Sequence, residues 1–175
     1  NGTNWTEVNT GLTVTYVTAL AVSVSGTDLF AGTFSGGVFL STNNGANWVP
    51  VNTGLTVPGE TRGSSFVWAL AFKASNLFAG VYGGGVSLST DNGTSWTTVN
   101  SGLTNTYVRT FAVSGTNLFA GSDGSGDVFL STNSGTSWTA VNSGLTRSNV
   151  HGFAVSGTNL FAGTYGGGVF LSTNN

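Results

Sequence analysis

The sequence predicts an all-β fold built from four copies of one antiparallel unit. The motif STNNGANW (Ser41–Trp48) recurs as STDNGTSW (Ser89–Trp96) and as STNSGTSW (Ser131–Trp138). Its two halves also stand at the ends of the chain, as STNN (Ser172–Asn175) and NGTNW (Asn1–Trp5). A period near 42 residues is typical of repeat architectures, in which one unit is too small to bury its own faces.

Each repeat contains four short β segments. In the first complete repeat we expect strands at Val17–Val22, from Asp28, from Gly37 and at Asn47–Asn52. Clusters of Gly, Asn, Ser and Thr separate these segments, as hairpin turns require. No segment has the apolar spacing of a helix, and the 28 glycines argue against long helices.

Four antiparallel strands in a repeat of this length describe one blade of a β-propeller, so we expect a single domain of four blades over residues 1–175. Residues 4–9 are the fourth strand of a blade whose first three strands lie at Val150–Thr173. We therefore expect Asn4–Asn9 to pair with Gly168–Thr173, which would remove two exposed sheet edges. One chain could close as a four-bladed ring. Two chains could instead form a homodimer by exchanging these strands into an eight-bladed ring, and open head-to-tail exchange would give a filament.

Composition narrows the classes of partner. Only 6% of the residues are charged and the net charge is −2, so there is no basic footprint for nucleic acid. No apolar run approaches the roughly 20 residues of a membrane span. The absence of cysteine excludes disulfides and thiolate metal sites. An uncharged surface of Ser, Thr, Asn and Gly is common in exported proteins, so we expect an extracellular or periplasmic location. Since the chain shows neither a signal peptide nor an initiator Met, we expect a processed product, an excised piece or a fragment.

The recurring motif Ser-x-Asp-x-Gly-x-x-Trp resembles the Asp-box, or bacterial neuraminidase repeat (BNR), of a β-propeller family. The resemblance covers essentially the whole chain. The repeats are similar to those of sialidases and of photosystem assembly factors. Only Asp91 keeps the acid, whereas Asn43, Asn133 and Asn174 stand at its place in the other copies. Asn still accepts backbone hydrogen bonds and tolerates turn conformations, so we expect the turn to survive.

We expect the motif to serve structure. The small polar residue caps the turn, the glycine adopts a positive φ, and the tryptophan folds back into the blade. In the sialidases that share it, the resemblance places the motif away from the active site. The residues with this expected role are Asn43, Gly45, Trp48, Asp91, Gly93, Trp96, Asn133, Gly135, Trp138, Asn174 and Trp5.

We expect a function at the end of the blades opposite the recurring motif. The first–second and third–fourth turns share one end, which is nearly uniform, while the second–third turns and the blade-to-blade connections share the opposite end. Departures from the repeat gather there, including an insertion at Val57–Ser65. The candidate ligand-binding residues are Thr18, Trp68, Arg109 and His151 on the first strands, with Phe34, Tyr82, Asp123 and Tyr165 on the turns.

These candidates suit a ligand with polar and flat apolar parts. Arg109 and His151 would bind a polar or anionic group. Trp68, Tyr82 and Tyr165 would stack on a sugar or another flat apolar ligand. Two other interpretations stay open: neutral variation at a solvated position, and a local ion pair between Arg109 and Asp123.

We assign no catalytic residue, no metal and no cofactor. His151 is the only histidine, and two carboxylates near the turn at Asp123 and Asp127 fall short of a calcium site. A sialidase would need three converging arginines and a Tyr–Glu pair. The residues available for this are Arg62, Arg109 and Arg147, with Glu60 as the candidate glutamate because Glu7 lies on an outer strand.

We therefore expect a non-catalytic binding or scaffold module whose partner is a glycan or another protein. The alternatives are a fragment of a sialidase-like or other glycoside hydrolase, and a purely structural or engineered repeat protein that forms rings or filaments.

Overall fold

The computed structural model describes residues 2–55, 65–124, 127–146 and 149–174. These residues form fifteen strands and no helix, and the strands make four antiparallel sheets. Within them, therefore, no helix exists that could cross a membrane. The predicted all-β class and the four repeated sheets are confirmed.

Each sheet is a meander in which consecutive strands are hydrogen-bonded neighbours. Sheet 1 contains β1 (Val17–Val22), β2 (Leu29–Thr33), β3 (Gly37–Ser41) and β4 (Val49–Pro50). Sheet 2 contains β5 (Val67–Lys73), β6 (Asn76–Val81), β7 (Gly85–Ser89) and β8 (Thr97–Thr98). Sheet 3 contains β9 (Val108–Ser114), β10 (Asn117–Ser122), β11 (Val128–Ser131) and β12 (Thr139–Ala140). Sheet 4 contains β13 (Val150–Ser156), β14 (Asn159–Thr164) and β15 (Gly168–Ser172).

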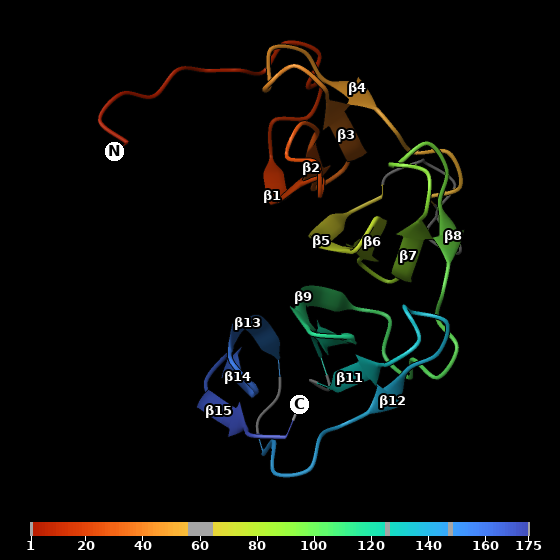
Figure 1. Cartoon of the computed structure of the whole chain (residues 1–175), viewed down its shortest axis with the longest axis vertical. Helices are drawn as coiled ribbons and strands as arrows, with labels where there is room; N and C mark the ends of the chain where they lie inside the picture. Colours follow the sequence, from red (N-terminus) through yellow and green to blue (C-terminus); the bar gives the residue numbers. More distant parts are fainter. Residues whose placement is uncertain (1, 56–64, 125–126, 147–148, 175) are drawn as a thin grey trace.

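The sheets follow one another around an arc, with their first strands toward its inside (Figure 1). β1 packs against β5, β5 against β9, and β9 against β13. An apolar cluster fills each of the three interfaces, and a fully buried phenylalanine of the second strand, such as Phe30 or Phe78, lies in the first two. Both faces of the inner sheets are thus covered, which is why their strands are apolar on both sides.

The third and fourth strands are joined by a turn that the motif builds; we call residues 41–48, 89–96 and 131–138 the box turns. In the second of them, the hydroxyl of Ser89 accepts the N–H of Gly93 at 2.8 Å, and the carboxylate of Asp91 accepts the N–H of Ser95 at 2.9 Å. Gly93 has a φ of 85°, a conformation that glycine adopts at little cost. The other two box turns repeat these bonds with Asn43 and Asn133 as acceptors.

Each box-turn tryptophan ties its sheet to the preceding fourth-strand segment. The indole N–H of Trp96 donates to the carbonyl of Val51 at 2.7 Å, and its backbone N–H donates to the carbonyl of Thr53 at 2.9 Å. Trp138 repeats both bonds in sheet 3, and Trp48 makes them to the N-terminal segment. Because these indoles are buried, each contributes both apolar burial and a satisfied hydrogen bond.

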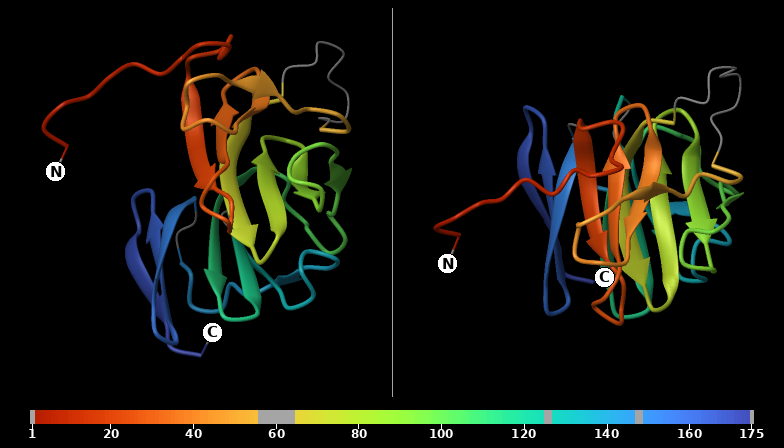
Figure 2. Two further views of the ribbon diagram at one scale, coloured as in Figure 1. Left: turned by 45° about the horizontal axis from the view of Figure 1, so that its top comes forward. Right: turned by 90° about the horizontal axis from the view of Figure 1, so that it is seen from above.

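The structure differs from the prediction at the closure of the ring. Sheet 4 has three strands, and the predicted pairing of Asn4–Asn9 with Gly168–Thr173 is not made. The N-terminal segment instead stays with sheet 1, because Trp48 bonds the carbonyls of Val8 and Thr10, and it then runs away from the arc (Figures 1 and 2). Trp5 is 90% exposed as a result.

Candidate binding surface

The two ends of the sheets are chemically different. At one end, the box turns meet the first–second turns: Asn92 donates to Asp28 at 2.6 Å, and Lys73 donates to Ser134 at 3.2 Å. At the opposite end, the second–third turns meet the segments that lead into the first strands. There Tyr82, for example, donates its backbone N–H to the carbonyl of Phe66 at 2.9 Å.

All four candidate residues of the first strands lie at β-bulges. In sheet 1, Val17 pairs with Thr33 and Ala19 with Gly32, so Thr18 is the extra residue. The same shift falls at the equivalent position of the other three sheets. The residues at these shifts are Trp68, Arg109 and His151. Bulges re-aim side chains and are frequent beside functional sites, and here one irregularity recurs where the repeats differ most.

Aromatic rings form a continuous line across sheets 1 to 3 at this end. Consecutive ring centroids are 5.1 Å apart for Tyr16 and Phe34, 4.6 Å for Phe34 and Phe66, and 6.4 Å for Phe66 and Tyr82. Tyr82 then contacts Tyr107 at 4.7 Å. With Trp68, which stacks on Tyr82 at 5.1 Å, we call these six residues the aromatic ridge.

The ridge is open to solvent, although its rings pack on one another. Tyr16 is 67% exposed, and Phe34, Tyr82 and Tyr107 are each about two-fifths exposed. Exposed aromatic groups that gather in one place mark binding surfaces more often than isolated ones do. The ridge is therefore the strongest candidate surface in the described residues.

Arg109 completes the ridge on the side of sheet 3. Its guanidinium carbon lies 3.9 Å from the centre of a Trp68 ring, and its Nη1 lies 2.9 Å from a carboxylate oxygen of Asp123. Both partners of the ion pair are about one-quarter exposed, so the pair contributes little to stability but fixes the guanidinium over the indole. The indole N–H of Trp68 has no hydrogen-bond partner among the described residues.

The remaining predicted residues divide between a second ring pair and a structural role. His151 stacks on Tyr165 in sheet 4, with centroids 5.6 Å apart, and both are exposed. Thr18 donates its hydroxyl to the carbonyls of Gly32 and Val67, which ties sheet 1 to sheet 2. Its side chain is therefore occupied by the backbone.

The structure thus brings together five of the eight predicted residues: Phe34, Trp68, Tyr82, Arg109 and Asp123. Sequence reasoning left three ridge residues out of the candidate set: Tyr16, Phe66 and Tyr107. The signal that could have found them is their shared repeat position, two residues before the bulge, which is aromatic in three of the four repeats.

Part of the predicted face lies outside the described residues. This applies to most of the insertion at Val57–Ser65, with Glu60 and Arg62, and to Arg147. In the described part of the chain, no group of three or more His, Asp or Glu side chains could hold a metal ion.

No protein-family model and no curated protein sequence matches this chain. Several solved structures do resemble it. The computationally designed Ika4 protein is 17% identical, with a TM-score of 0.66 over 91% of both chains. YCF48 bound to D1 peptide is 13% identical, with a TM-score of 0.65 over 89% of this chain and 50% of its own.

The fold is a β-propeller. The GH74 enzyme of Niastella koreensis, 25% identical, extends this likeness with a TM-score of 0.60 over 89% of this chain. This propeller chain spans only 22% of the enzyme and half of YCF48, whereas it spans nearly the whole of Ika4. At these identities, the first two structures show the architecture alone.

Proposed function

We propose that this chain is a non-catalytic binding module and that the aromatic ridge is its ligand surface. The observation that carries the proposal is the unbroken line of rings over three blades, in which Tyr16, Phe34, Tyr82 and Tyr107 are exposed. Exposed rings in contact with one another lose little conformational freedom when a ligand stacks on them, which favours binding.

A glycan is the ligand that fits this chemistry best. The apolar faces of sugar rings stack on aromatic side chains, and their hydroxyl groups need polar partners at the edges. Arg109 and Asp123 supply a donor and an acceptor beside Trp68, and His151 supplies another polar group on sheet 4. The low charge of the chain also suits a neutral ligand and an extracellular or periplasmic setting.

The box turns belong to the same proposal as structural elements of the Asp-box type. Their Ser, Asp or Asn, and Gly groups are occupied by bonds within the turn. Their tryptophans are buried against the preceding segment. A ligand would therefore find few free polar groups there.

Glycoside hydrolysis is the second candidate, because the GH74 neighbour is a glycoside hydrolase. It requires two carboxyl groups about 5–10 Å apart on either side of the scissile bond. The carboxylate of Asp123 is engaged by Arg109, and Asp127 accepts a bond from Asn142 at 2.6 Å. Such engaged groups are poor candidates for proton transfer, so binding without turnover is the better fit.

A glycan array followed by calorimetric titration tests the proposal. We expect a glycan that binds the 175-residue chain and whose affinity falls about fivefold for Tyr16→Ala or Tyr107→Ala, since one stacked ring contributes about 1 kcal/mol. Tyr16→Phe and Tyr107→Phe keep the ring and should bind nearly as well.

Val24→Ala is the matched control, because Val24 is 71% exposed at the opposite, box-turn end of sheet 1. Equal affinity of the wild type and the Tyr16→Ala/Tyr107→Ala double variant would refute the ridge as the binding surface. Release of a fluorophore from a glycoside by the purified chain, lost in Asp123→Asn, would establish the enzyme instead.

A further inference from the structure

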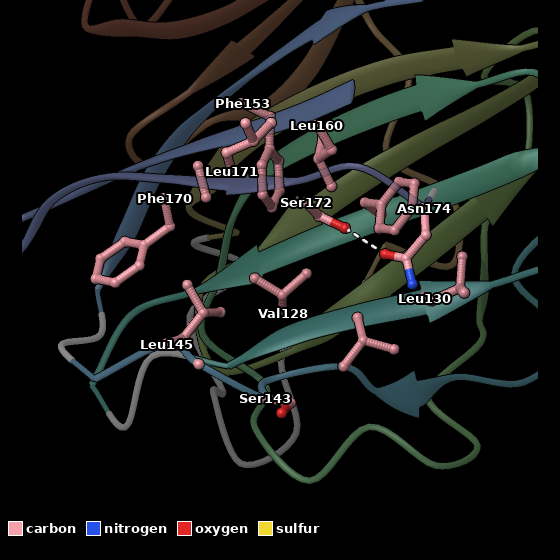
Figure 3. A pocket seen from close by; sticks show the side chains of 14 residues that line it. Val128, Leu130, Ser143, Leu145, Phe153, Leu160, Phe170, Leu171, Ser172 and Asn174 are labelled. Atoms are coloured by element: carbon pink, nitrogen blue, oxygen red, sulfur yellow. Dashed lines mark hydrogen bonds between the residues drawn. The ribbon is translucent and has the colours of Figure 1, made fainter. Parts of the chain in front are cut away.

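A groove with a volume of about 420 Å³ runs beside β15, between sheets 3 and 4 (Figure 3). Its walls are mostly apolar, and Val128, Leu130, Leu145, Phe153, Leu160 and Leu171 contribute to them. The equivalent places in the other two interfaces are filled by Trp96 and Trp138, which belong to the apolar clusters there. The cluster between sheets 3 and 4 contains no tryptophan.

The acceptors for a tryptophan are present in this groove. Trp138 donates its indole N–H to Val99 at 2.8 Å and its backbone N–H to Ser101 at 2.8 Å. One repeat later, the residues at these two positions are Val141 and Ser143, and both line the groove. The tryptophan one repeat later is Trp5, which is 90% exposed.

A glycine beside the groove indicates the same missing tryptophan. Gly54 and Gly102 have φ values of 82° and 83°, and a Cβ on either would collide with the carbonyl oxygen of Trp96 or Trp138. Gly144 has the equivalent φ of 86°, but a Cβ there would meet no atom within 4 Å. The backbone at Gly144 is therefore shaped for a neighbour that the described residues of the single chain do not provide.

β15 also has an unpaired edge, at the position where the third strand of the other sheets pairs with a fourth strand. In sheets 1 and 3, the N–H groups of Val38 and Val128 donate to the side chains of Asn52 and Asn142, each at 2.7 Å. The equivalent residue in sheet 4 is Val169, whose partner by repeat position is Asn9. Val38 is fully buried and Val128 nearly so, whereas Val169 is 73% exposed.

We propose that residues 2–12 of a second copy of this chain occupy the groove and the open edge of β15. By repeat register, Thr6 of the second copy pairs with Leu171, and Trp5 enters the groove and donates to Val141 and Ser143. The second copy receives the same segment from the first, so the two chains close as a two-fold ring of eight blades. Each exchanged segment removes an exposed sheet edge and buries an indole.

Two observations favour a second copy over the chain's own segment. Trp48 holds Val8 and Thr10 against sheet 1, and from there the segment runs outward from the arc (Figure 2). Sheets 1 and 4 stand at the two ends of that arc (Figure 1), and both ends are apolar and exposed, with Leu20 at 70% and Leu171 at 54%.

The first test is the solution mass by light scattering over a range of concentrations. We expect twice the 17.7 kDa of one chain. Trp5→Ala should raise the dissociation constant more than about 100-fold, as expected for truncation of a buried tryptophan. Gly144→Ala should do the same, because its Cβ would collide with the carbonyl of the incoming Trp5 while meeting nothing in the single chain.

Gly26→Ala is the matched control. Gly26 has a φ of 76°, and a Cβ there would also meet no atom within 4 Å, but Gly26 belongs to sheet 1 and does not line the groove. It should stay dimeric. A monomeric wild type at every concentration, or a dimer unaffected by both Trp5→Ala and Gly144→Ala, would overturn the proposal.

A disulfide distinguishes exchange between chains from closure within one chain. The chain has no cysteine, and the pairing predicts that Thr6→Cys and Leu171→Cys lie within bonding distance across the exchanged strand. Oxidation of the double variant should give a covalent dimer on a non-reducing gel. A bond within a monomer would overturn the proposal in favour of a four-bladed ring, and a ladder of higher species would overturn it in favour of an open filament.

Discussion

At the scale of single residues, the box turn tolerates Asn in place of Asp because the turn uses an oxygen and not a charge. Asn43 and Asn133 accept the same backbone N–H as Asp91, each at 2.9 Å. Asn133 even keeps a link to Ser137, through its amide nitrogen. The chemistry of an amide oxygen therefore allowed this turn to be predicted from the sequence alone.

The retained acid should show itself in the pH dependence of stability. Hydrogen bonds from the Ser95 hydroxyl, the Ser95 N–H and the Ser89 hydroxyl hold the pKa of Asp91 below its ordinary value of 3.8. A pKa lowered in the folded state stabilises the fold above the ordinary value and loses that effect as the pH falls through the folded value. As the pH falls from about 5 to about 2, the melting temperature of Asp91→Asn should therefore decrease less than that of the wild type.

The two proteins differ only at residue 91, so the difference between the two melting curves isolates Asp91. Circular dichroism at several pH values is sufficient for this comparison. Parallel curves over the whole range would contradict the assigned cause of the pKa shift.

A second residue-scale prediction concerns Thr18, whose hydroxyl bridges two sheets. Thr18→Val keeps the shape but leaves the carbonyls of Gly32 and Val67 without this donor, so we expect a loss of about 1 kcal/mol in the free energy of unfolding. Urea titration measures it, and Thr18→Ser, which keeps the hydroxyl, should recover most of the loss. Equal stability of the Val variant and the wild type would show that the bridge contributes nothing.

At the scale of elements, the strands were predictable from alternation and turn residues, but their outer limits were not. The fourth strands were expected to have six residues, whereas β4, β8 and β12 have two each. The reason is that a side chain continues the ladder: Asn100 accepts the N–H of Val86 at 2.8 Å and donates to the carbonyl of Gly84 at 2.8 Å. A sequence pattern of period two does not distinguish such a side-chain bond from a backbone one.

That asparagine should be essential to its sheet. In Asn100→Ala, the buried N–H of Val86 loses its partner, and we expect a loss of about 1–3 kcal/mol in the free energy of unfolding. Asn9→Ala is the matched control, because Asn9 is exposed and makes no such bond within the single chain. Urea unfolding of both, in a monomeric Gly144→Ala background, should affect only the first. A loss of the same size in Asn9→Ala would imply closure within one chain.

The bulges explain why the candidate site was found only in part. A bulge inserts one residue without changing the apolar pattern around it. Trp68 and Arg109 were therefore recognised because the residue type at this position differs between repeats, and not because the sequence indicated irregular pairing. The ridge residues Phe34 and Phe66 meet because a turn of one sheet contacts the segment that leads into the next. Such contacts cross repeats and have no fixed spacing in the sequence.

At the scale of the whole molecule, the sequence specified four blades but left the closure of the ring open. The strand order and the hydrogen bonds of the box turns recur with the repeat, so one copy predicts the others. The curvature of the arc is different, because it sums small angles from many side chains at each interface between sheets. No single residue encodes that sum, and this is why both a four-bladed and an eight-bladed ring fitted the sequence.

A circular permutant separates the exchange of strands from the packing of sheets. The permuted chain would begin at Thr13, run to Asn175 and continue directly with Gly2–Leu12, because Asn175 takes the place of Asn44 in the motif. Its fourth sheet then receives its own fourth strand and Trp5. Two such chains would still meet through the faces of sheets 1 and 4 and through Trp48, but no strand would cross between them.

The permutant should therefore dimerise at least about tenfold more weakly than the parent chain, because the strand hydrogen bonds and the indole now lie within one chain and no longer hold two together. Sedimentation at a series of concentrations measures both dissociation constants. If the permutant dimerises as tightly as the parent, the sheet faces alone hold the ring, and the N-terminal strand is a filler of the groove without a role in assembly.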